Sequence, residues 1–117
     1  YCATEDLLPL RGVHALVISD CEGFEYQLFT SAVIEAMDRS IVIVETHPYV
    51  DGGDNAALVR AFERTHSIQM IISETGNRLS REEYAPYLRE EEFARAVDEY
   101  RPAAQQWLCA APLRARA

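Results

Sequence analysis

The sequence contains no lysine. All 11 of its basic residues are arginine, they face 19 acidic residues, and the formal net charge is -8 over 117 residues. A chain of this charge repels polyanions, so we expect neither nucleic acid nor an anionic membrane surface as a partner. The 3 cysteines, at positions 2, 21 and 109, show no C-x-x-C spacing, which argues against a disulfide framework and a zinc knuckle.

Long apolar runs and glycine-rich phosphate loops are also missing. No run approaches the ~20 residues of a membrane-spanning helix, and no basic-then-apolar leader opens the chain, so we expect a cytoplasmic protein that does not bind membranes. No G-x-G-x-x-G or P-loop pattern follows an apolar run, so nucleotide binding by this chain alone is not supported. With 49% hydrophobic residues and only 5 Gly and 5 Pro, the composition predicts one folded domain.

Four short runs rich in β-branched or apolar residues predict strands at 14–19, 41–44, 67–72 and 105–110. Helical spacing predicts helices over 24–37, over 54–62 with Asp54 as N-cap, in a short piece from Ser80, and over 90–100. The fold class is therefore α/β: a partial doubly wound, Rossmann-like sheet, mostly parallel, with an antiparallel last strand. The lack of alternation in the first strand predicts helices on both of its faces.

Ligands of such sheets gather at the carboxyl ends of the strands. The first of these turns contains Asp20, Glu22 and Glu25, and Gly23 lets the backbone bend sharply before the helix. Carboxylates at this position can act as a general base, bind a substrate hydroxyl, or ligate a divalent cation. The alternative is that Asp20 or Glu22 only caps the following helix.

The second turn contains Glu45 and His47, at the end of a buried strand. A buried acid is costly without a partner, and the ends of nearby parallel strands lie within about 5–10 Å, so Asp20, Glu45 and His47 can share one pocket. The alternative is that Glu45 accepts local backbone hydrogen bonds and His47 has no role beyond preceding Pro48. A divalent-metal site at Asp20, Glu22, Glu45 and His47 is a further option.

Other reactive side chains favour structural interpretations. Cys21 lies near a helix N-terminus, where a thiol can become nucleophilic, but a buried structural cysteine is the commoner case. His14 and His66 are isolated in the sequence, and Trp107 is expected in the core or a lid because no basic groove accompanies it.

The segment Asp20-Cys-Glu-Gly-Phe-Glu25, with the later Ile-Val-Ile-Val-Glu45-Thr-His47-Pro, resembles FkbM-type S-adenosylmethionine-dependent methyltransferases. The resemblance implies that residues 1–117 form the C-terminal half of a class I methyltransferase-like domain. It places Asp20 and Glu45 as catalytic residues and Glu22 and His47 as substrate-binding residues, facing a small-molecule or glycan acceptor. S-adenosylmethionine would be bound by residues outside this chain, so the chain alone should be inactive.

Two functions follow from the resemblance. The first is the acceptor-side half of a methyltransferase that acts on oxygen. The alternative is a non-catalytic α/β interaction or assembly module derived from such an enzyme. In either case the strand at 14–19 would have an unpaired apolar edge, which we expect to pair with the missing half or with another chain.

Overall fold

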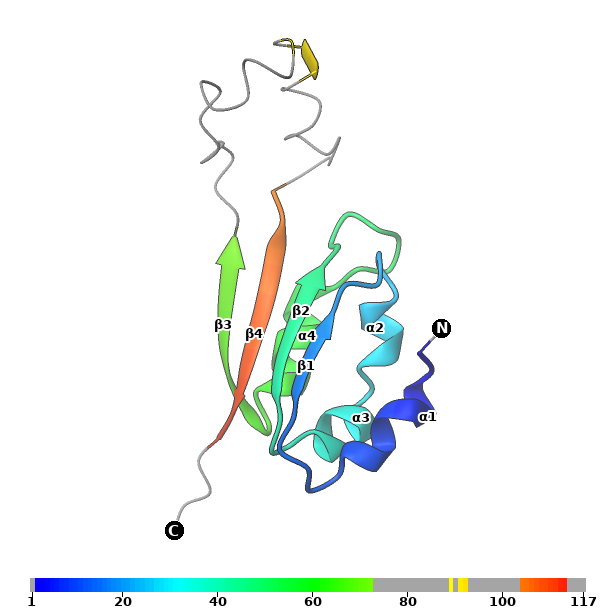
Figure 1. The fold of residues 1–117 in the computed structure, drawn as a ribbon, viewed down its shortest axis with the longest axis vertical. Coiled ribbons are helices and arrows are strands. Elements are labelled where there is room, and N and C mark those ends of the chain that lie inside the picture. The colour runs from blue at the N-terminus through cyan, green and yellow to red at the C-terminus, as the bar shows by residue number, and fades with distance from the viewer. Residues whose placement is uncertain (1, 73–88, 90, 93–103, 114–117) are drawn as a thin grey trace.

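The computed structural model describes residues 2–72, 89, 91–92 and 104–113. Figure 1 shows these residues as a sheet with short helices packed beside it. In chain order the elements are α1 (Thr4–Leu7), the 3-10 turn η1 (Leu8–Leu10), β1 (Leu16–Ser19), α2 (Glu25–Leu28), α3 (Ser31–Ala36), β2 (Ile41–Thr46), α4 (Asn55–Phe62), β3 (His66–Ile72) and β4 (Gln106–Pro112).

The four predicted strands are all present, within two residues of the predicted bounds. The helix predicted from Asp54 is confirmed, since the Asp54 side chain accepts a hydrogen bond from the Ala57 N–H at 2.8 Å. The helices predicted at Ser80 and over 90–100 lie outside the described residues, apart from positions 91 and 92.

The single helix predicted over 24–37 is wrong, because the chain forms two short helices there. Thr30 adopts an extended conformation after α2, and its hydroxyl accepts a hydrogen bond from the Val33 N–H at 3.4 Å. A threonine that caps a new helix interrupts the old one. The apolar residues still reach the core, because each short helix keeps its buried side toward the sheet.

The sheet is open and mixed, with strand order β1-β2-β4-β3. β1 and β2 are parallel, whereas β4 is antiparallel to both β2 and β3. The antiparallel last strand is confirmed, but the mostly parallel pairing is wrong. β4 returns between β2 and β3, so the two later strand pairs are both antiparallel although β1, β2 and β3 run in one direction.

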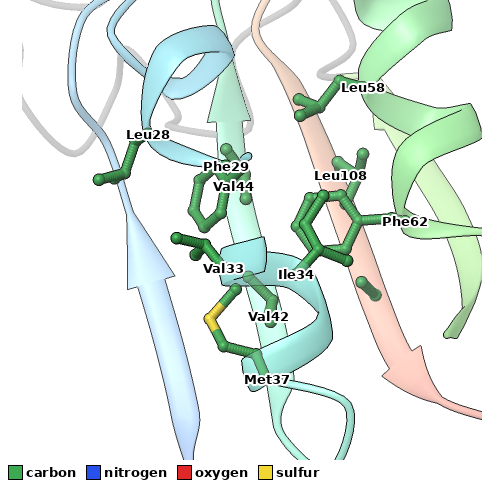
Figure 2. Packing of buried hydrophobic residues seen from close by; sticks show 11 residues of the cluster. Leu28, Phe29, Val33, Ile34, Met37, Val42, Val44, Leu58, Phe62 and Leu108 are labelled. Carbon is green, nitrogen blue, oxygen red and sulfur yellow. The ribbon is translucent and has the colours of Figure 1, made fainter. Parts of the chain in front are cut away.

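The core lies between the sheet and the helices. Figure 2 shows Val42 and Val44 of β2 and Leu108 of β4 on the helix-covered face of the sheet. They pack with Phe29, Val33 and Met37 and with Phe62 of α4 in one cluster. These side chains are at most 5% exposed. Burying large side chains of this kind is worth about 1.5–3 kcal/mol each, so this one layer supplies most of the stabilisation of the described fold.

The opposite face of the sheet is uncovered in the described part of the chain. Leu16 and Ile18 of β1 are 60% and 64% exposed, and Ile41 of β2, opposite Leu16 in register, is 49% exposed. The expected cover of both faces of β1 is therefore not found there. None of the helices among the described residues has the length and apolarity needed to cross a membrane.

Candidate functional site

Parallel pairing of β1 and β2 brings their carboxyl ends to the same edge of the sheet. Ser19, the last residue of β1, lies opposite Val44, so Asp20 and Glu45 follow at neighbouring positions. Asp20, Glu45 and His47 each offer an oxygen or nitrogen, and these atoms lie within 4.8 Å of one another. The structure thus brings together three of the four predicted site residues, and the fourth, Glu22, also approaches His47.

The turn after β1 has an unusual backbone that positions its acids. Glu22 and Gly23 both have positive φ, at 51° and 98°. A Cβ on Gly23 would lie 2.8 Å from Cγ1 of Val50, so the turn packs directly against the loop after β2. Glycine is required at position 23 for both its dihedral and its lack of a side chain.

Glu25 connects the two turns from a fully buried position. Its Oε1 accepts hydrogen bonds from the His47 backbone N–H at 2.7 Å and contacts His47 Nδ1 at 3.0 Å. Its Oε2 accepts from the Gly23 N–H at 2.8 Å. Sequence reasoning noted Glu25 as the third acid of the turn but gave it no role. Nothing in the sequence distinguishes Glu25 from its neighbouring acids, because its partner His47 lies 22 positions away along the chain.

The two ring nitrogens of His47 have different surroundings: Nδ1 contacts Glu25, and Nε2 makes no hydrogen bond. Because both oxygens of Glu25 accept hydrogen bonds from backbone N–H groups, Nδ1 is the donor in its contact with Oε1. Nε2, the other ring nitrogen, is fully buried without a hydrogen-bond partner. It lies 3.7 Å from Asp20 Oδ1 and 3.5 Å from Glu22 Oε2.

Glu45 differs from Asp20 in its accessibility. Its side chain is 2% exposed and accepts a hydrogen bond from Gln105 Nε2 at 3.3 Å, whereas Asp20 is 46% exposed. The prediction that Glu45 is buried and needs a partner is confirmed. Asp20 and Glu22, which is 75% exposed, are therefore accessible to a small molecule from solvent, whereas Glu45 is not.

A second polar network lies next to these acids and was missed from the sequence. The Tyr26 hydroxyl donates to Asn55 Oδ1 at 2.7 Å, and Asn55 Nδ2 donates to Thr46 Oγ1 at 3.1 Å and Gln106 Oε1 at 2.8 Å. Burial, with the nearby Glu25 charge, raises the pKa of Tyr26 to about 12. The network ties α2, α4 and the ends of β2 and β4 together.

Cys21 is a poor nucleophile in this setting. Burial raises the pKa of its thiol, and the Glu25 and Asp20 charges add to this, although a contact with the Ser19 hydroxyl acts in the opposite direction. The thiolate is the reactive form, so a raised pKa lowers reactivity. His66 is structural: its ring lies within 3.1 Å of the Met37 and Ser40 carbonyls and 2.7 Å from the Thr65 hydroxyl.

A groove of about 700 Å³ runs beside β1 and opens near these acids. Apolar side chains from α1, β1 and α2 form most of its wall, and Asp20 and Glu22 lie at one end. A groove of this size accommodates a small molecule.

We found no protein-family model, curated protein or solved structure that matches this chain.

Proposed function

We propose that this chain forms the acceptor side of an S-adenosylmethionine-dependent methyltransferase that acts on oxygen. The proposal combines the resemblance of the Asp20–Glu25 segment to FkbM-type enzymes with one structural observation. That observation is the convergence of Asp20, Glu45 and His47 at the carboxyl ends of two parallel strands, within 4.8 Å. Sites of open α/β sheets form at this edge.

The accessibility of the carboxylates suggests how they divide the work. Methyl transfer to oxygen requires the acceptor hydroxyl to lose a proton as the new C–O bond forms. Asp20 is the better general base, because it is half-exposed while Glu45 is buried and already accepts from Gln105. Glu45 then acts as a positioning residue for its neighbours Asp20 and His47.

His47 and Glu22 suit a substrate with more than one hydroxyl. The Nε2 lone pair of His47 can accept a hydrogen bond from a hydroxyl next to the reacting one, and Glu22 can accept from a third. A vicinal diol, as in a sugar or a catechol, would satisfy Asp20 and His47 together. The apolar groove beside β1 would take the rest of the acceptor.

The described residues do not fit the methyl donor. The turns after β1 and β2 are acidic. Gly23 could allow a ligand to approach the backbone closely, but Val50 occupies the space beside it and its N–H already donates to Glu25. We therefore assign the donor to residues outside the described part of the chain, and no catalytic step is derived through it.

The test uses the complete protein in which this chain occurs, with S-adenosylmethionine carrying a tritiated methyl group and a panel of hexoses and catechols. We expect label transfer, and Asp20→Asn should lower kcat by about 10²–10⁴-fold, the usual contribution of a general base, with KM for the donor unchanged. His47→Asn should raise KM for the acceptor. Asp38→Asn, which changes the net charge equally at an exposed site, is the control.

Two results would refute this proposal. One is a wild-type protein that transfers no label to any member of the panel. The other is an Asp20→Asn variant that keeps the wild-type kcat, because the role assigned to Asp20 would then be wrong.

A specific observation favours the second candidate, a non-catalytic interaction module. The exposed side chains of Leu16, Ile18 and Ile41 form an apolar strip beside the outer edge of β1, which pairs with no strand among the described residues. Such a strip suits pairing with another strand or chain. Calorimetry of this chain with S-adenosylmethionine should give no heat under either candidate, so label transfer by the complete protein is what distinguishes them.

A further inference from the structure

The buried Nε2 of His47 is unsatisfied. The side chain is 1% exposed, and this atom makes no hydrogen bond to any described residue, although carboxylate oxygens of Glu22 and Asp20 lie 3.5 Å and 3.7 Å away. Leaving a buried polar atom without a partner is unfavourable, and exceptions often mark a functional site or a bound ion. A ligand at Nε2 would remove the penalty.

The other side of the ring has the environment of a metal-binding histidine. Such histidines usually donate their second ring N–H to a carboxylate, which fixes the tautomer and aims the lone pair at the metal. Glu25 Oε1 contacts Nδ1 at 3.0 Å and accepts the His47 backbone N–H at 2.7 Å, so the main chain of His47 is held in place and the ring cannot turn without breaking its Nδ1 contact. The lone pair of Nε2 is thereby fixed toward Asp20 and Glu22.

The remaining donors are anionic and close. Ligands of one transition-metal ion lie about 2.0–2.2 Å from it, so two of them are at most about 4.4 Å apart. The donor atoms of Asp20, Glu45 and His47 lie within 4.8 Å of one another, and Asp20 Oδ1 is 3.7 Å from His47 Nε2, so the set is close to the spacing of one ion's ligands. The hydrogen bond from Gln105 to Glu45 is compatible with this, because a carboxylate has several lone pairs.

Charge also favours a cation here. Asp20, Glu22 and Glu25 all approach the His47 ring. Within the described ranges arginine side chains pair with Glu35 and Glu92, and neither pair involves Asp20. A dication would neutralise this concentration of negative charge.

We propose that Asp20, Glu45 and His47 bind a divalent cation of the first transition row, such as Zn²⁺ or Mn²⁺. One imidazole and two carboxylates favour these ions over Ca²⁺, which prefers oxygen ligands alone. The inference uses the crevice of the proposed function and specifies it further, since the cation would bind the acceptor hydroxyl that otherwise faces His47. It does not depend on methyl transfer, because the cation binds without donor or acceptor.

The test uses the metal-free full chain with the substitution Cys2→Ser, which removes an exposed thiol. Zn²⁺, Mn²⁺ or Ca²⁺ is titrated into it, and the melting temperature is measured. We expect a saturable rise with Zn²⁺ and Mn²⁺, and a smaller one with Ca²⁺. Asp20→Asn and His47→Asn should each weaken Zn²⁺ binding by about tenfold or more. The asparagine at 47 places an amide near the position of Nδ1, so it can still donate to Glu25 while the ligand is lost.

Asp38→Asn is the matched control and should bind Zn²⁺ within about twofold of the parent chain. An equal loss in Asp38→Asn, or no saturable rise in the parent, overturns the inference. If a site variant fails to fold, Mn²⁺ added to the parent chain should broaden the ring-proton signals of His47 before those of His14 and His66, and uniform broadening overturns it. Label transfer that survives chelation, with no Zn²⁺ binding, would reject the metal and leave the proposed methyl transfer intact.

Discussion

Oε1 of Glu25 accepts the backbone N–H of His47 at 2.7 Å and lies 3.0 Å from its Nδ1, so a single carboxylate oxygen fixes both the main chain and the ring of that histidine. Glu25 follows β1 and His47 follows β2, and this contact therefore joins the two turns of the candidate site. Loss of the carboxylate would free His47 as well as the turn.

Glu25→Gln should destabilise the fold. The substitution replaces one accepting oxygen by an NH₂ group that faces an N–H donor, and a buried donor left without an acceptor costs about 1–3 kcal/mol. Chemical denaturation should show a loss of this size in the free energy of unfolding. Glu63→Gln, on the exposed end of α4, should change it by less than about 0.5 kcal/mol. Similar values for the two variants would mean that Glu25 does not connect the turns.

Gly23→Ala should be more damaging than Gly12→Ala. Both glycines have positive φ, 98° and 75°, but a Cβ at Gly23 meets Val50 Cγ1 at 2.8 Å whereas one at Gly12 meets nothing within 4 Å. The dihedral penalty of about 1–3 kcal/mol applies to both, and the clash adds to Gly23 alone. Thermal melts should rank them in this order, and Val50→Ala should partly rescue Gly23→Ala. Equal melting temperatures would contradict the packing of the two turns.

Tyr26 gives a pH dependence whose sign follows from its raised pKa. The folded-state pKa is about 12, against an ordinary value of 10, so folding favours the neutral phenol. Its contribution to stability is complete below pH 10 and is lost as the pH rises from 10 through 12. Tyr26→Phe should therefore show a shallower loss of stability than wild type across this window. Parallel losses, measured by denaturation at each pH, would mean that Tyr26 is not held neutral.

The sheet face that the described residues leave uncovered predicts self-association of the isolated chain. Ile18 is 64% exposed on the edge strand, so Ile18→Lys should reduce association by placing a charge there. Leu113→Lys, at a residue 51% exposed beyond β4, is the control and should leave association unchanged. Light scattering makes the comparison, and a monodisperse monomer of the unsubstituted chain would contradict the prediction.

The sequence was sufficient for the strands and for the edge where the acids meet. Short β-branched runs at 14–19 and 41–44 identified β1 and β2, and a parallel pair necessarily places Asp20 and Glu45 at one end. It was not sufficient for the strand order, because nothing in residues 105–110 shows that β4 enters between β2 and β3. That choice depends on long-range pairing, which local patterns do not encode.

The split of the predicted 24–37 helix and the role of Glu25 were also hidden, for different reasons. Helical spacing continues across Thr30, and only its cap contact reveals the break. Glu25 is one acid among several, and its partner His47 is 22 positions away along the chain. Sequence patterns identify which residue types follow a strand, but the pairing of their side chains depends on the loop after β2.

The measurement that tests the central claim most directly is a long-range ¹H–¹⁵N correlation spectrum of the His47 ring, with and without Zn²⁺. The orientation imposed by Glu25 predicts a proton on Nδ1 in both spectra, and a shift on Zn²⁺ addition that is largest at Nε2. A ring that carries its proton on Nε2, or an Nε2 signal that Zn²⁺ leaves in place, would contradict it.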